Sequence, residues 1–216
     1  MKNVVWLLCS CAFFVTTACA QNSVTIQADV WADNWFAFYL AETLIMEDTV
    51  PIATERSFNK ESFRFEASYP LMLNFVAKDF KENDTGLEYI GTNRQQMGDG
   101  GLIAQFKDAS TGELIAVTNS DWQCLVIHDA PLDKSCERSS NPTQDCSFSS
   151  QAEPAGWKLA SFDTSTWPAA TVYSEAAVRP RDGYDQVSWD ARAELIWGDD
   201  LETNNTLLCQ LVVESP

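Results

Sequence analysis

The sequence predicts an all-β protein whose strands pack as a β-sandwich. Apolar and polar residues alternate over many short segments, which is the two-residue period of a half-buried strand. Polar turns rich in Asp, Asn, Ser and Gly separate these segments. No segment shows a strong apolar period of 3.6 residues, so we expect little helix.

The strongest alternation runs through residues 24–45, and we expect the rest of the chain to pack around it. One apolar series occupies residues 24–31 and a second occupies residues 35–40, with a short polar interruption between them. β-Branched and aromatic side chains, which fit a pleated and half-buried surface, dominate both series. We therefore predict a hairpin of two strands at the centre of the sandwich.

Weaker alternation continues along the chain. Residues 62–67 and 71–78 predict a second hairpin, with Phe63, Phe65 and Ala67 on one face of its first strand. Five further strands are predicted at residues 102–106, 113–118, 122–128, 193–197 and 206–213. The intervening residues 79–101 and 129–154 are long and polar, and we expect loops there.

Residues 1–20 have the order of a secretory signal peptide: a basic start at Lys2, an apolar run, and small residues ending at Ala20. The apolar run is short for a membrane span, which needs roughly 20 residues. We expect cleavage after Ala20 and a single β-sandwich domain over residues 21–216, secreted, periplasmic or at the cell surface. The alternative is a lipid-bearing Cys19, although Thr16 stands where a lipoprotein usually has a bulky aliphatic residue.

Four of the seven cysteines lie outside the expected signal peptide. An even number in an exported chain predicts two disulfides, for which three pairings are possible. We favour Cys136–Cys146, which closes a small polar loop, and Cys124–Cys209, which joins two strands far apart in the sequence. Zinc is the other common use of four cysteines, but no C-x-x-C pair is present and oxidising surroundings disfavour it.

The formal net charge of −17 at pH 7 restricts the partners of the protein. Binding to phosphates requires clustered Lys and Arg, so the acidity argues against nucleic acid and against anionic membranes. Neutral sugars, cations and basic proteins remain compatible with it. The simpler interpretation is a well-solvated acidic surface without any specific acidic site.

Four segments in sequence order resemble the galactose-binding-like jelly-roll modules found at the N-terminus of rhamnosidase-type glycoside hydrolases. They are VWADNWFAFYL, GGLIAQFKDASTGELIAVTNSDWQC, GWKLASFDTSTWPAATVYS and WDARAELIWGDD, which cover about half of residues 21–216. The resemblance implies a jelly-roll sandwich and, more weakly, an association with carbohydrate. One departure is Ala41–Glu42, where these modules carry an Asn-Gly hairpin turn.

Tryptophan is the residue type that most favours carbohydrate binding here, because sugar rings stack on exposed indoles. Trp35, Trp122 and Trp197 alternate with apolar residues and are predicted to lie in the core. The predicted binding residues combine an aromatic ring with neighbouring polar groups, and they are Trp31, Asp33, Asn34, Trp189 and Asp190. The alternative is that these indoles also fill the core, with their N–H groups satisfied.

Calcium is the most plausible ion, because exported β modules often brace their loops with oxygen ligands. The predicted ligands are Asp99, Asp121 and Asp199, with Asp33, Asp79 and Asp200 as further candidates. No D-x-D-x-D-G loop is present, so solvated carboxylates in turns explain the same residues equally simply.

The sequence shows no pattern that predicts an enzyme. His128 is the single histidine, and no G-x-S-x-G, Walker, Rossmann or HExxH motif accompanies it. We therefore expect a non-catalytic module that binds carbohydrate or another surface ligand. The alternative is a structural or interaction module of an envelope or extracellular assembly.

Overall fold

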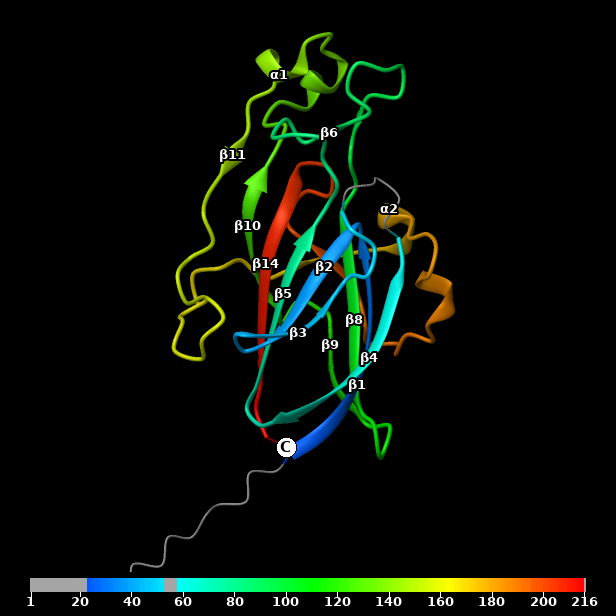
Figure 1. Cartoon of the computed structure of the whole chain (residues 1–216), viewed down its shortest axis with the longest axis vertical. Helices are drawn as coiled ribbons and strands as arrows, with labels where there is room; N and C mark the ends of the chain where they lie inside the picture. Colours follow the sequence, from blue (N-terminus) through cyan, green and yellow to red (C-terminus); the bar gives the residue numbers. More distant parts are fainter. Residues whose placement is uncertain (1–22, 53–57, 216) are drawn as a thin grey trace, which may run out of the picture.

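The computed structural model describes residues 23–52 and 58–215, and it confirms the predicted all-β fold. Two antiparallel six-stranded sheets face each other as a sandwich (Figure 1). The first, here the β1 sheet, contains β12 (Thr171–Tyr173), β13 (Leu195–Trp197), β8 (Gly101–Asp108), β1 (Ser23–Asp33) and β4 (Lys60–Ser68), with β9 (Leu114–Val117) also paired to β8. The second, here the β14 sheet, contains β11 (Ser149–Ser150), β10 (Gln123–Asp129), β14 (Asn204–Val213), β5 (Leu71–Lys78), β2 (Trp35–Leu40) and β3 (Thr43–Glu47).

Short elements close the ends of the sandwich. Strands β6 (Leu87–Glu88) and β7 (Gln96–Met97) form a small separate ribbon. The helical turns are η1 (Lys134–Arg138), α1 (Pro142–Asp145), α2 (Glu175–Val178) and η2 (Tyr184–Gln186). The β6, η1 and α1 segments gather at one end of the molecule, opposite the C-terminus (Figure 1).

Both predicted hairpins are wrong, because the chain crosses between the sheets at the two predicted turns. β1 belongs to the β1 sheet and β2 to the β14 sheet, and β4 and β5 are divided in the same way. The apolar faces of β1 and β2 both point into the sandwich, so the two strands face each other across the core instead of pairing edge to edge. The hairpin partner of β2 is β3, reached through Ala41–Glu42 with Ala41 at a positive φ of 47°.

Phe38 on β2 lies at the centre of the shared core. Its ring centroid is between 5.0 and 5.8 Å from those of Phe63, Phe65, Phe75 and Phe106, which come from both sheets. The predicted shared face of Phe63, Phe65 and Ala67 is therefore correct. Aromatic rings at these separations add favourable edge and stacking contacts to the free energy of burial.

Of the three tryptophans predicted to lie in the core, two do so and the third does not. Trp122 and Trp197 are buried in it, as predicted. Trp35 is half-buried on the outer face of the β14 sheet, where the Lys78 ammonium lies 4.7 Å from its ring centroid.

Irregular segments cover the outer faces of both sheets. Val178 and Tyr184 pack on the outer face of the β1 sheet. Trp157 and Trp167 pack on the outer face of the β14 sheet. The segment that carries α2 lies along one side of the molecule and the segment from about residue 150 to 170 along the other (Figure 1).

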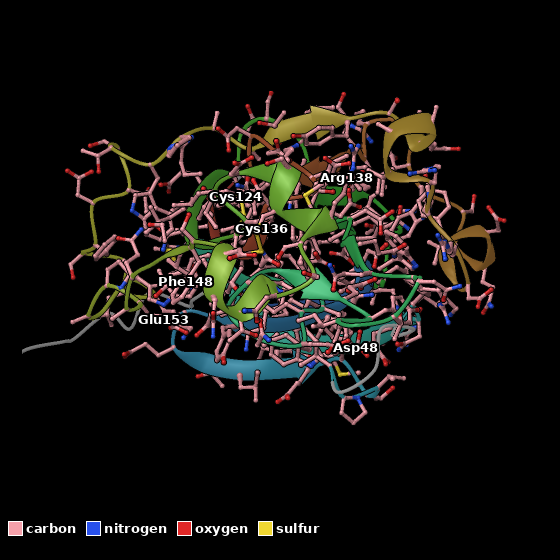
Figure 2. The ribbon with its side chains drawn as sticks, turned by 90° about the horizontal axis from the view of Figure 1, so that it is seen from above. Asp48, Cys124, Cys136, Arg138, Phe148 and Glu153 are labelled. Atoms are coloured by element: carbon pink, nitrogen blue, oxygen red, sulfur yellow. A yellow bond between two sulfur atoms is a disulfide. The ribbon has the colours of Figure 1, made fainter. Side chains whose placement is uncertain are left out.

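Both predicted disulfides are present. Cys124 on β10 stands directly opposite Cys209 on β14, so this bridge links neighbouring strands of one sheet. Cys136–Cys146 closes the loop that contains η1 and α1, at the end of the sandwich seen from above in Figure 2. Two structural disulfides are typical of proteins that fold in an oxidising compartment.

The predicted signal peptide, with Cys9, Cys11 and Cys19, lies outside the described residues. Within residues 23–52 and 58–215, no helix is long and apolar enough to cross a membrane.

The two disulfides should differ in their contribution to stability. The Cys124–Cys209 bridge has a sequence separation of 85 and Cys136–Cys146 one of 10, so the first restricts the unfolded chain more. Replacing Cys124 and Cys209 by Ser should lower the free energy of unfolding by about 4–5 kcal/mol, against about 3 kcal/mol for the Cys136 and Cys146 pair. Urea denaturation of the two double variants measures this difference, and a larger loss from the shorter loop would contradict it.

Candidate ligand-binding site

Trp31 cannot serve as the exposed binding residue that the sequence predicts. Its side chain is fully buried, and its indole N–H donates to the Asp182 carbonyl at 3.1 Å. The Tyr184 ring packs edge-on at 5.7 Å. The prediction was wrong because the segment after α2 folds back over this face of the β1 sheet. Acidic neighbours in the sequence do not reveal such a cover.

Asp33 and Asn34 are also buried, with 2% of each exposed. They form the crossing between β1 and β2. The Asn34 N–H donates to the Lys78 carbonyl at 2.9 Å, and Asn34 Oδ1 accepts from the Phe80 N–H at 2.6 Å. These contacts give Asn34 a role in holding the crossing together, and they place Asp33 away from the surface.

Trp189 packs on the same outer-face cluster as Trp31, and the Tyr184 ring lies 5.7 Å from each of the two indoles. The half-buried Trp189 donates its indole N–H to the Tyr184 carbonyl at 3.1 Å. Asp190 is bound to Arg192 through two hydrogen bonds, of 2.8 and 3.1 Å, and this guanidinium lowers the pKa of Asp190 to about 2. Both side chains are thus bonded within the protein, and because Trp31 is fully buried the three residues do not form one exposed binding surface.

One cavity, of about 690 Å³, is lined in part by Asp190 and Arg192. Another polar cavity lies at the end of the sandwich that carries the β6–β7 ribbon. It has a volume of about 530 Å³ and opens between the β7–β8 link, η1, α2 and the β13–β14 turn. We call it the acidic cleft. Its charged lining residues are Asp99, Glu137, Asp199, Asp200, Glu202, Lys134, Arg179 and Arg181.

The charges of the acidic cleft are partly paired. The Lys134 ammonium lies 2.6 Å from Asp200 and 2.8 Å from Glu202, both of which belong to the β13–β14 turn. Burial raises the pKa of Asp99, while Arg181 and Arg179 oppose that shift. Tyr173 adds one aromatic ring, whose hydroxyl donates to the Gly198 carbonyl at 2.9 Å. The lining of the acidic cleft therefore contains carboxylates, which accept hydrogen bonds, close to guanidiniums, which donate them.

A second cavity of about 170 Å³ shares Gln96, Asp99 and Arg181 with the acidic cleft. Its far wall includes Phe58 and Tyr89, which lie under the Arg181 and Arg94 guanidiniums at 5.3 and 3.8 Å respectively. The shared residues thus separate two adjoining polar spaces at one end of the molecule.

The predicted calcium ligands are not brought together. Asp99 and Asp199 both line the acidic cleft, whereas Asp121 is exposed in a turn and accepts a hydrogen bond from the Asn119 side chain at 2.9 Å. Within the part of the chain that the structure describes, no three Asp, Glu, His or Cys side chains form a metal-binding group. The sequence alone does not show which turn carboxylates are exposed and which line a cavity.

His128 occupies a position near the end of β10 that fits the structural interpretation. Its ring is buried and stacks on Phe148 at 5.8 Å with an angle of 12° between the rings. Burial lowers the pKa of His128, although Asp84, 3.3 Å from Nε2, opposes that shift.

Sequence reasoning missed Arg179 and Arg181, which supply two of the three basic groups of the acidic cleft. They flank Pro180 in a chain with 14 basic and 31 acidic residues. Two closely spaced arginines in so acidic a chain were the available signal.

No protein family model, no curated protein and no solved structure matches this chain.

Asp48 is a buried carboxylate outside the acidic cleft, and the effect of burial on its pKa can be tested. It follows β3, on the side of the molecule away from Arg138 in Figure 2. Burial raises the pKa of Asp48 to about 6, although the Val50 N–H donates to Oδ1 at 2.9 Å.

Replacing Asp48 by Asn should stabilise the protein at pH 8, by on the order of 1 kcal/mol after solvent screening. A folded-state pKa above the unfolded value means that ionisation opposes folding, so the wild-type protein loses stability as pH rises from about 4 through 6. The advantage of the variant should vanish at pH 4. Urea denaturation at both pH values measures it, and an equal difference at both would contradict the raised pKa.

Proposed function

We propose that this chain is an exported, non-catalytic module that binds a neutral carbohydrate in the acidic cleft. The observation that carries the proposal is the lining of the cleft, which combines five carboxylates, three basic groups and a tyrosine. Sugar hydroxyls both donate and accept hydrogen bonds, so neighbouring carboxylates and guanidiniums can bind the same ring. A phosphorylated or sulfated ligand fits less well, because acidic groups outnumber basic ones.

The size and position of the acidic cleft support the same function. A volume of about 530 Å³ falls within the range of roughly 300–1,000 Å³ that is usual for small-ligand sites. Loops at the end of a rigid sandwich form it, and binding residues are often presented in this way. Export through a signal peptide ending near Ala20 agrees with the two disulfides.

The alternative is a structural or interaction module without a small-molecule ligand. The burial of Trp31 favours it, because the aromatic residue first expected on the surface contributes to packing instead. The outer faces of both sheets are covered by other segments of the chain. This also favours the alternative, because the tryptophans on those faces pack within the protein.

Variants of the shared wall test the proposed function. Residues 21–216 should bind one or more neutral glycans on a glycan array, and calorimetry should confirm the interaction in solution. Arg181→Gln and Asp99→Asn should each weaken that binding by tenfold or more, since each removes a charged hydrogen-bonding group worth roughly 1.5–3 kcal/mol. Arg192→Gln is the matched control, because Arg192 is exposed and bound to Asp190 away from the acidic cleft.

The carbohydrate proposal fails if the folded protein binds no glycan on the array. It also fails if Arg192→Gln weakens binding as much as Arg181→Gln, because the ligand would then occupy another surface.

A further inference from the structure

Three buried oxygen atoms near the crossing between the sheets lack hydrogen-bond partners among the described residues. They are Asp33 Oδ1, Asp79 Oδ2 and Asn205 Oδ1. Their residues are 2%, 3% and 0% exposed. Buried polar atoms are almost always bonded, and an unpaired carboxylate is especially unfavourable, so each of these oxygens needs a partner that the protein chain does not supply.

Strand register places the Asn205 and Asp79 side chains on one face. Lys78 pairs with Thr206, so Asp79 stands opposite Asn205, and the Asp79 N–H donates to the Asn205 carbonyl at 3.0 Å. Directly opposite residues of antiparallel strands project to the same side of the sheet. Ala77 and Leu207, one pleat away, point into the core. The Asp79 and Asn205 side chains therefore enter the same end of the sandwich interior.

Asp33 reaches this region from the other sheet, because the next residue, Asn34, bonds to the Lys78 carbonyl and to the Phe80 N–H on either side of Asp79. Burial raises the pKa of Asp79 well above its ordinary value, and the charge of Asp33 is the next largest cause. Burial likewise raises the pKa of Asp33; nearby Asp99 and Glu88 add to the shift, and Arg181 opposes it. When two carboxylates share a buried space, each disfavours the ionisation of the other, and a nearby cation would favour the ionised form of both.

Arg181 opposes the pKa shift of Asp33, but no basic group is among the causes that act on Asp79. Both hydrogen bonds of the Asn205 amide nitrogen go to backbone carbonyls, of Ala130 at 2.8 Å and Thr203 at 2.6 Å, so its Oδ1 is left as an acceptor. The backbone also approaches the Asp79 carboxylate closely, because a Cβ on Gly98 would lie 2.1 Å from Asp79 Oδ2. A side chain at position 98 would therefore clash with the Asp79 carboxylate.

We propose that Asp33, Asp79 and Asn205 bind a calcium ion that joins the two sheets where the chain crosses between them. Two carboxylates and an amide oxygen are hard ligands of the kind that Ca²⁺ prefers, and neutral oxygens would complete its coordination. The proposed site contains two acidic side chains, and no group of three acidic, His or Cys side chains that could hold a metal is found among the described residues. The inference is independent of carbohydrate binding.

Calcium titration of residues 21–216, after treatment with a chelator, tests the site. A saturating excess of Ca²⁺, about 100 times the dissociation constant, should raise the melting temperature by about 5–10 °C. Tb³⁺ should displace Ca²⁺ and show luminescence sensitised by tryptophan, because Trp31 precedes Asp33 by two residues. Asp79→Asn and Asp33→Asn should each weaken Ca²⁺ binding at least tenfold.

Asp121→Asn is the matched control, since it removes one acidic charge from an exposed turn and should leave the response to Ca²⁺ unchanged. Circular dichroism shows whether each variant is folded. Because two separate Asp→Asn variants are made, the test is still possible if one of them does not fold. The proposal is overturned if the chelator and Ca²⁺ leave the wild-type melting temperature unchanged. In that case a shared proton or a buried water would be the partner of the three oxygens. Loss of the response in Asp121→Asn, with retention in Asp79→Asn, would also overturn it.

Discussion

The contact of Phe38 with phenylalanines from both sheets is the interaction on which the rest of the structure depends. It requires β1 and β2 to face each other across the core, although β1 ends at Asp33 and β2 begins at Trp35. One residue, Asn34, must then carry the chain from one sheet to the other. The polar residues of this crossing cannot reach solvent, because the layers that they join close around them.

Two kinds of polar site lie near this end of the sandwich. In the acidic cleft, Lys134 pairs with Asp200 and Glu202, and solvent screens the remaining charges. At the crossing, Asp33 and Asp79 are buried, and their carboxylates carry unpaired oxygens. The first arrangement suits an exchangeable ligand with many hydroxyls. The second suits a resident cation, because desolvation strengthens the attraction between carboxylates and a positive charge.

The sequence was sufficient to predict most of the long strands, the inward face of residues 62–67 and both disulfides, since each depends on local alternation or on cysteine number. It missed β3, and it placed Trp35 in the core although Trp35 lies on the outer face of the β14 sheet. It did not predict which strands pair. The alternation in residues 24–45 specifies two faces, but it is the same for a hairpin and for two strands that oppose each other across a core. The role of Trp31 depended on residues more than 140 positions later, which cover it.

The candidate sites were predicted less well than the fold. Asp33 and Asp99 were recognised as potential ligands, but Asp121 carried the same sequence signal and lies exposed in its turn. Asp33 differs from Asp121 in its burial and in its Oδ1, which lacks a hydrogen-bond partner among the described residues. Both properties depend on strand register and on packing between segments that are distant in the sequence.

The interpretation of this end of the sandwich depends most on the burial of Asp33 and Asp79 with one oxygen of each carboxylate lacking a partner. Titration of their carboxyl carbons by nuclear magnetic resonance, in protein freed of divalent cations, tests this directly. The account predicts that the pKa of both carboxyls lies well above the ordinary aspartate value of 3.8. Two carboxyls that titrate near 3.8 would contradict it, because they would be exposed or already paired within the protein.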